Sequence, residues 1–407
     1  MKSRWHFTLL GAAILAGIAL FEVGVRAAHI DYNLSPNWKY HPVLGWSQVP
    51  GGSYDVVIQG RPVHVGFNKL GFRDIEHQRS KPPGTRRVVI IGDSFSEAVQ
   101  VNLEETFHQV LQQLLNQADS AKWEIINVGV GDFGTAQEYI ALLNYGLAFE
   151  PDVVIHEIFP LNDICNNELA LYELCRSQND RFRPYYIESG RDLVLTSAQP
   201  VRNWLRHHSV SYSIVEYWLL RVGGYDPQSA EDRGRPRRMR RAGFGGLDPL
   251  LYTYVDVRDE PASVAEGWRI TERLIERIVD TTRARGAAYI GMVVPFEVAL
   301  TDTVWNKFAR LMPPPPANRL YPEQRFTALF QRLRVGSVMV SDAFQPYVAE
   351  VLPYVGGHFS AAGHRRAAEA LYREMVKRGL LHPARRPAGG ETPTRLLDQN
   401  ARARRIR

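Results

Sequence analysis

Arg87–Ser96 reads RVVIIGDSFS, an apolar and β-branched run that passes into glycine, aspartate and serine. The run Val88–Ile91 is typical of a buried strand, and the residues after it favour a sharp turn. Similar runs recur at Glu124–Val130 (EIINVGV) and Asp152–Phe159 (DVVIHEIF), with helical patterns between them. Strands that alternate with helices predict right-handed crossovers and a parallel sheet covered on both faces.

The alternation resumes after residue 261. Helices are expected over Glu104–Gln117, Thr135–Leu147, Ala265–Arg285 and Ala361–Lys377, and further strands over Ala287–Val294 and Ser337–Asp342. In the first of these helices the apolar residues recur on one face, as an amphipathic helix requires. We therefore predict an α/β fold, a three-layer α/β/α sandwich with a mainly parallel sheet.

Other segments surround this core. Residues 40–79 contain short extended pieces rich in Gly and Pro and predict a small β-rich lead-in. The main domain is expected over 85–380, with an insertion at 166–261 that lacks the alternation and could form a lid or substrate wall. Residues 382–407 lack apolar periodicity and are expected to be a disordered basic tail.

The N-terminus, residues 1–28, has the pattern of a membrane segment. Lys2 and Arg4 precede the uncharged, mostly apolar run Phe7–Phe21, and positive charge before a span keeps the N-terminus in the cytoplasm. A cleaved signal peptide is the alternative. Arg26 occupies the minus-three position for cleavage after Ala28, which leaves no A-x-A site. We therefore favour an uncleaved signal anchor in the cell membrane, with the remainder in the periplasm.

The formal net charge is +6, and the basic excess gathers in Arg233–Arg241 and Arg402–Arg407. Such clusters can bind nucleic acid or lipid headgroups. A solvated loop and a disordered end explain them more simply, and no nucleic-acid module is recognisable, so no nucleic-acid partner is predicted. The two cysteines, Cys165 and Cys175, could form one disulfide in an oxidising compartment or remain free thiols in a reducing one. Export favours the disulfide.

Three polar features fall at the edge of the sheet where ligands bind in such folds. Ser94 follows the first strand and is a candidate nucleophile. Asn162 follows the strand Asp152–Phe159 and could donate to an oxyanion. His358 opens the last helix and could act as a base. By itself, a serine such as Ser94 is more often a cap or turn residue, and Asn162 with Asp163 is more often part of a turn. A metal site formed by His358 and His364 is the alternative for the histidine, but their spacing of six residues suits neither one helical face nor the HExxH pattern, so neither a metal nor another cofactor is predicted.

Taken together, four blocks resemble the SGNH/GDSL hydrolase superfamily. They are Gly92–Ser96 (GDSFS), Asn127–Gly134 (NVGVGDFG), Leu161–Asp163 (LND) and His358–His364 (HFSAAGH). Asn68–Asp74 (NKLGFRD) resembles the lead-in of an exported bacterial branch of that family. The resemblance covers roughly 40–165 and 265–380, and it implies an SGNH/flavodoxin-like sheet and ester chemistry.

The resemblance also implies roles for the residues. Ser94 would be the nucleophile, with its own amide as one oxyanion donor, Asn162 would supply a side-chain donor, and His358 would be the general base. His364 would then be a surface or helix-capping residue.

The oxyanion hole departs from the family pattern. The glycine whose amide usually completes it falls at Asp132, where a backbone N–H is still present. Gly131 or Gly134 could serve instead. Asp93, beside the nucleophile, is a further candidate for the oxyanion and substrate pocket.

The family's acid is missing. An Asp normally stands two or three residues before the histidine, and here those positions are Gly356 and Val355. Either a Ser-His dyad uses a backbone carbonyl to orient the imidazole, or Asp342, at the end of the preceding strand, completes a triad. We favour the dyad.

The expected function is hydrolysis of an acyl ester, an O-acetyl or similar group on an envelope glycan or lipid. Transfer of the acyl group to a sugar hydroxyl is a close variant, which would make the protein a polysaccharide O-acyltransferase. The alternative from another class is a catalytically inactive glycan-binding or assembly protein that kept the fold after losing its acid.

Overall fold

The computed structural model describes residues 2–28, 37–171, 174, 182–190, 192–197, 199–222, 249–255, 260–310, 318–348 and 354–381. Their centre is a five-stranded sheet in the order β11-β10-β7-β5-β6, with every neighbouring pair parallel. The strands are β5 (Thr85–Ile91), β6 (Lys122–Asn127), β7 (Val153–Ile158), β10 (Ala288–Val293) and β11 (Gly336–Met339). In chain order this is the doubly wound 2-1-3-4-5 arrangement of flavodoxin-like folds.

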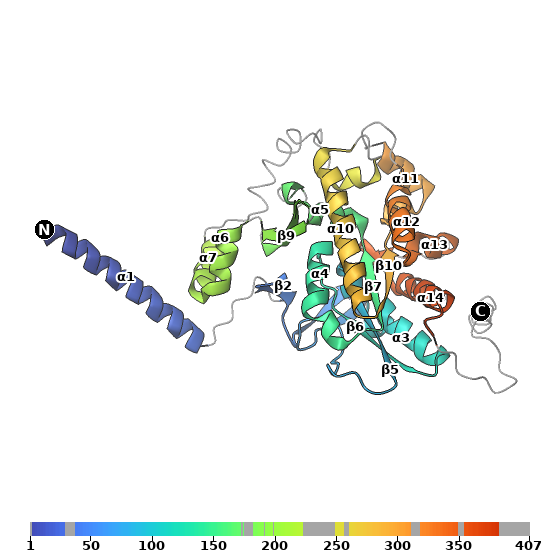
Figure 1. Ribbon diagram of the computed structural model, residues 1–407, viewed down its shortest axis with the longest axis horizontal. Helices are drawn as coiled ribbons and strands as arrows, with labels where there is room; N and C mark the ends of the chain where they lie inside the picture. The colour runs from blue at the N-terminus through green and yellow to red at the C-terminus, as the bar shows by residue number, and fades with distance from the viewer. Residues whose placement is uncertain are drawn as a thin grey trace.

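Helices cover both faces of the sheet (Figure 1). The principal ones are α3 (Phe107–Ala118), α4 (Thr135–Asn144), α5 (Pro160–Asn167), α10 (Ala262–Ala284), α11 (Asp302–Ala309), α12 (Tyr321–Leu333), α13 (Val340–Phe344) and α14 (Ala361–Lys377). The last helix and the three-layer fold class are confirmed. The other expected elements are present with ends displaced by a few residues.

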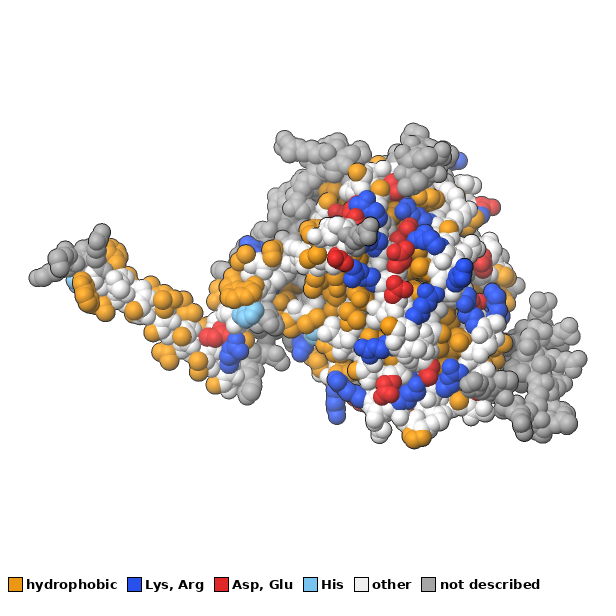
Figure 2. All heavy atoms as spheres, in the orientation of Figure 1, with side chains coloured by type: hydrophobic (Ala, Val, Ile, Leu, Met, Phe, Trp, Pro, Cys, Tyr) orange, Lys and Arg blue, Asp and Glu red, His pale blue; other side chains and the backbone are white. Residues whose placement is uncertain are grey.

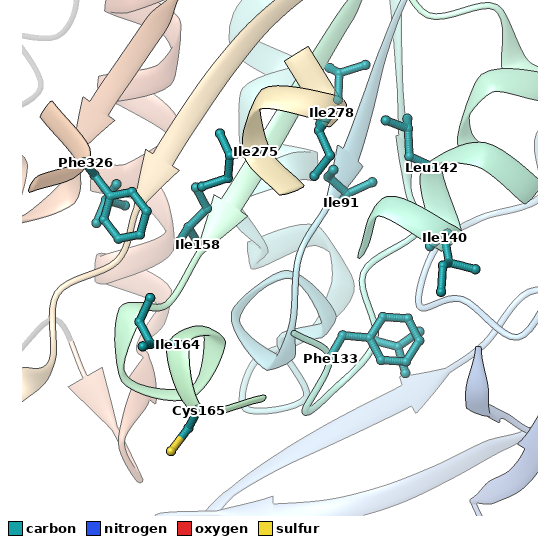
Figure 3. Close-up of a cluster of buried hydrophobic side chains, with 14 of the residues drawn as sticks. Ile91, Phe133, Ile140, Leu142, Ile158, Ile164, Cys165, Ile275, Ile278 and Phe326 are labelled. Atoms are coloured by element: carbon teal, nitrogen blue, oxygen red, sulfur yellow. The ribbon is translucent and has the colours of Figure 1, made fainter. Parts of the chain in front are cut away.

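The strand β5 shows how the layers form. Val89 and Ile91 face a core shared with α4, α10 and α12, part of which Figure 3 shows. Val88 and Ile90 face a second core shared with α3 and α14. Side chains of a strand alternate between its two faces, so a continuous apolar run is what a strand covered on both faces requires.

The lead-in consists of two antiparallel hairpins. The first pairs β1 (Trp38–His41) with β2 (Gly45–Gln48), and the second pairs β3 (Ser53–Ile58) with β4 (Arg61–Gly66). This β-rich lead-in was predicted.

The described part of the insertion contains the hairpin β8–β9 (Pro184–Ser189, Asp192–Ser197) and helices α6 (Pro200–His208) and α7 (Val210–Val222). Short 3₁₀ helices occur at Leu103–Glu105, Gly146–Phe149, Leu169–Leu171, Pro249–Tyr254, Glu297–Ala299 and Gln345–Tyr347.

The N-terminal helix α1 (Lys2–Ala27) projects away from the domain, with its C-terminal end beside α7 (Figure 1). Its segment Trp5–Ala27 is long and apolar enough to cross a membrane, a test that a signal sequence also passes. Cys165 is disulfide-bonded. The expected partner Cys175, the basic run Arg233–Arg241 and the C-terminal tail 382–407 lie outside the described residues.

Candidate active site

The turn between β5 and the short helix α2 (Ser94–Glu97) presents Ser94 at the edge of the sheet. Asp93 caps this helix, because its Oδ1 accepts a hydrogen bond from the Phe95 N–H at 2.9 Å. Gly92 has no room for a side chain, since a Cβ there would overlap Glu157 Oε2 and Ser96 Oγ. The glycine therefore lets the chain turn tightly over Glu157.

The lead-in motif Asn68–Asp74 is hydrogen-bonded to the segment that follows this turn. Arg73 is buried, and its guanidinium donates to the carbonyl oxygens of Glu97, Ala98 and Val101, at the end of α2 and just after it. Asp74 Oδ2 accepts a hydrogen bond of 2.8 Å from the Asn127 N–H at the end of β6. The motif thus fastens the segment that carries Ser94 to the neighbouring strand.

His358 lies on a small hairpin that precedes α14. The hairpin pairs β12 (Tyr354–Val355) with β13 (His358–Phe359), and its loop is Gly356–Gly357. Both glycines have positive φ angles, 56° and 79°, as a two-residue type I′ turn requires. The positions where the family carries its acid therefore belong to a tight turn.

Ser94 and His358 meet, although 264 residues separate them. His358 Nε2 lies 2.8 Å from Ser94 Oγ, and its Nδ1 lies 3.3 Å from the Gly356 carbonyl oxygen. If Nδ1 carries the proton, it donates to that carbonyl and leaves Nε2 free to accept the serine proton. The Phe95 ring packs on the imidazole at 4.9 Å between centroids and restricts its rotation.

Asn162 approaches the same turn from the other side of the switch point. It lies in α5, which follows β7, the strand next to β5. Its Nδ2 donates to Asp93 Oδ2 at 2.6 Å. One N–H of this amide is thereby fixed, and the second is left for another acceptor. Asp93 therefore holds both the turn that carries Ser94 and the side chain of Asn162.

Gly131 and Asp132, the two candidates for the oxyanion hole after β6, make different contacts. The Gly131 N–H donates to Glu97 Oε2 at 2.7 Å, so this amide is engaged inside the protein. Asp132 has a left-handed φ of 65°. Its carboxylate pairs with Arg183 at 3.4 Å, and its carbonyl oxygen accepts from the same guanidinium at 2.9 Å. Its negative charge is thereby balanced by an arginine from the insertion.

Asp342 and His364 lie apart from the Ser94–His358 pair. Asp342 is exposed on α13 and lines a separate cavity of about 330 Å³ with Glu323 and Ser341. Among the described residues, the hydrogen bonds of His358 go to Ser94 and Gly356 and not to a carboxylate. His364 is buried, and its Nδ1 accepts from the Phe107 N–H at the start of α3.

A group of buried carboxyl groups lies beneath the turn. Glu157 Oε2 accepts from the Asp93 N–H at 2.9 Å and from Ser96 Oγ at 3.1 Å. Burial raises the pKa of Glu157 and Asp93 above the ordinary values, and it raises the pKa of Asp163 to about 8. The lost hydration of the carboxylates is the main cause. Among the described residues, no cluster of three or more His, Cys, Asp or Glu side chains could hold a metal ion.

Comparison with known proteins gives matches in structure alone. No family model matches the chain, and no curated protein does. A catalytic mutant of an acetylxylan esterase from Geobacillus stearothermophilus aligns with 73% of this chain and 96% of its own, at 12% identity and a TM-score of 0.38. TesA aligns with 72% of this chain and 99% of its own, at 12% identity and a TM-score of 0.35.

A further match is a G-D-S-L family lipolytic protein from Desulfitobacterium hafniense, which covers 71% of this chain and 98% of its own. Its identity is 13% and its TM-score 0.34. Likenesses this remote carry no argument about the residues or substrate of this chain.

Several contributors to the site were not identified from the sequence. Gly356 could have been recognised, because a Gly-Gly pair is a known signal of a hairpin turn. Glu157 lies inside an apolar strand, and nothing in its neighbours distinguishes it. Arg183 comes from the insertion, which no block of the resemblance covers.

Proposed function

We propose that the protein is an ester hydrolase of the SGNH type, with Ser94 as nucleophile and His358 as general base. The observation that carries the proposal is the 2.8 Å contact between Ser94 Oγ and His358 Nε2 at the switch point of the sheet. A nucleophile within hydrogen-bond reach of a base that is itself oriented is the arrangement acyl transfer needs.

The steps follow from these atoms. Ser94 Oγ attacks the ester carbonyl carbon while Nε2 of His358 takes its proton, and the Gly356 carbonyl holds the opposite edge of the ring. The Ser94 N–H, at the first position of α2, has no partner within that helix. Together with the second N–H of Asn162 it would stabilise the oxyanion. The imidazolium then protonates the leaving alkoxide.

In the second half, His358 takes a proton from water, whose oxygen attacks the acyl group on Ser94. Collapse of this intermediate releases the acid and returns the proton to Ser94. The imidazolium that forms in each half faces a neutral carbonyl, which stabilises it less than a carboxylate would. The proposed enzyme therefore works with a Ser94–His358 dyad and without a third, acidic residue.

The proposed substrate is an O-acetyl or similar ester on an envelope glycan or lipid. The helix α1 supports this choice, because a retained anchor with positive charge before it would hold the domain on the periplasmic side of the cell membrane. Transfer to a sugar hydroxyl uses the same acyl-enzyme and differs in which nucleophile arrives second.

Hydrolysis of p-nitrophenyl acetate by the full-length protein in detergent tests the proposal, together with labelling by a fluorophosphonate probe. Ser94→Ala and His358→Ala should each abolish hydrolysis, and Ser94→Ala should abolish labelling. The matched control is Ser53→Ala, which changes an exposed serine on β3 and should leave both intact. A folded protein that neither hydrolyses nor labels would contradict the proposal and favour the glycan-binding alternative.

A further inference from the structure

Two helices of the insertion carry large apolar side chains that are exposed on the protein surface. On α6, Val201 is 71% exposed and Trp204 is 59% exposed. On α7, Val215 is 48% exposed and Trp218 is 58% exposed. Each pair is spaced i, i+3 and therefore shares one helix face. Figure 2 shows hydrophobic side chains on this part of the surface and along the adjoining α1.

The helix α1 is fastened to the start of α7. Glu22 of α1 accepts hydrogen bonds from Ser209 Oγ at 2.9 Å, from the Val210 N–H at 3.0 Å and from the Ser211 N–H at 2.9 Å. A carboxylate in this place satisfies N–H groups that have no partner within the helix. The charged residue that interrupts the apolar segment is thus the cap of another helix.

A second contact strengthens this junction. Arg26 pairs with Glu22 at 2.7 Å. It also donates a hydrogen bond of 2.9 Å to the carbonyl oxygen of His208, which is the last residue of α6. Val25, between them, is buried. The junction therefore holds both helices at the C-terminal end of α1.

The α6–α7 pair is in turn fastened to the catalytic domain. Arg206 of α6 pairs with Glu216 of α7 at 2.7 Å, and its guanidinium lies over the Phe182 ring at 4.6 Å. The Tyr40 hydroxyl of β1 donates to the Asn203 carbonyl oxygen at 3.3 Å. A continuous set of contacts thus runs from α1 through α6 and α7 to the lead-in.

We propose that the exposed face of α6 and α7, with Trp204 and Trp218, is a membrane-interface surface that lies on the lipid headgroups beside the point where α1 leaves the bilayer. The inference rests on the anchored orientation in the proposed function. Its support is continuity, because the contacts of Glu22 and Arg26 place these tryptophans next to the polar end of the apolar segment. Tryptophan is enriched at that depth, since its ring is apolar and its N–H is polar.

The test uses single cysteines in the full-length chain, labelled with an environment-sensitive fluorophore. Of the two native cysteines Cys165 is disulfide-bonded, so an introduced thiol is the one to be labelled. Trp204→Cys and Trp218→Cys report on the surface, and Ile14→Cys reports on α1. The matched control is Val57→Cys, at a residue 68% exposed on β3. The protein is reconstituted into vesicles of phosphatidylethanolamine and phosphatidylglycerol that carry a nitroxide-labelled lipid.

We expect quenching at positions 204 and 218 to be several-fold greater than at position 57. This quenching should stay unchanged when the ratio of protein to lipid is lowered. Glu22→Ala should reduce quenching at 204 while quenching at 14 persists. Equal quenching at 204, 218 and 57 would overturn the proposal, and so would a signal that falls on dilution, which indicates a second copy of the chain as the partner.

Loss of quenching at 14 as well would refute the anchor along with the surface. Hydrolysis of p-nitrophenyl acetate by the same labelled proteins reports separately on the proposed chemistry, since this ester is soluble and none of the changed residues lies at Ser94. Failure of catalysis and failure of the membrane surface therefore give different results.

Discussion

At the scale of single residues, Gly356 determines what the proposed base can do. Its carbonyl lies 3.3 Å from His358 Nδ1 and can fix the tautomer as a carboxylate would. It carries no charge, so it stabilises the imidazolium less. Activity would then be set by orientation and by the oxyanion donors.

Asp342→Asn tests whether a more distant carboxylate contributes. Asp342 is exposed and lines the cavity with Glu323, so we expect kcat/KM on p-nitrophenyl acetate to stay unchanged. Loss of a triad acid can cost about 10⁴-fold. A decrease approaching that size would show that Asp342 acts on His358, whereas Asp302→Asn, on α11, should have no effect.

Asn162→Ala tests the proposed oxyanion donor. Because the asparagine amide is held by Asp93 at 2.6 Å, it is preorganised, and its removal should lower kcat by about 10²–10³-fold with little change in KM. Steady-state kinetics with a soluble acetyl ester measure both constants. Asn144→Ala, at an exposed residue of α4, serves as the control, and an unchanged kcat in Asn162→Ala would exclude the role.

At the scale of elements, the long periodic segments were predictable and the short ones were not. The helix α14 matches its expected range Ala361–Lys377 because its apolar face and its Ser360 cap are both local signals. The β12 and β13 strands are two residues each, too short for any alternation to appear. Helices α6, α7 and α12 were missed, because the segments around them are rich in Gly, Pro and Arg.

The candidate site also contains residues that the sequence could predict and contacts that it could not. Ser94, Asn162 and His358 follow or precede recognisable elements, so they could be proposed from the chain alone. The binding of the Gly131 N–H by Glu97 could not, because it depends on how the end of α2 approaches the loop after β6. Sequence spacing carries no information on that approach.

Gly92→Ala tests the turn between β5 and α2. The new methyl would overlap Glu157 Oε2 and Ser96 Oγ, and forcing atoms into a packed interior costs about 1–3 kcal/mol. We expect a lower free energy of unfolding in urea and reduced ester hydrolysis. Gly66→Ala is the control, since its Cβ would be 3.6 Å from the nearest atom, His64 Nε2. Equal stability of the two variants would contradict the packing argument.

At the scale of the whole molecule, buried acids make stability depend on pH. Burial raises the pKa of Glu97 to about 7 and that of Asp163 to about 8. Between about pH 4, the ordinary carboxyl pKa, and these raised values the folded state keeps a proton that the unfolded state has lost, so stability falls as pH rises through that window. Buried histidines act oppositely at lower pH, because burial lowers the pKa of His156 to about 3 and that of His108 to about 4.

The histidine contribution is complete above about pH 6.5, the ordinary histidine pKa. Between about pH 6.5 and 8 the acids therefore act alone, and the thermal unfolding temperature should fall. Asp163→Asn should make this decrease shallower when melting is followed by circular dichroism. An unfolding temperature that stays constant across the interval would show that these carboxyl groups are already ionised in the folded state.

The pairing of Arg183 with Asp132 has a consequence for protein engineering. Arg183 is almost fully buried, covers the Trp46 ring and comes from the segment that a designer would first remove to obtain a shorter form of the proposed esterase. Truncation there would remove the ion pair that Arg183 makes with Asp132, close to the turn that carries Ser94. A shortened variant should therefore also carry Asp132→Gly, which removes the carboxylate that Arg183 had balanced and suits the left-handed backbone at that position.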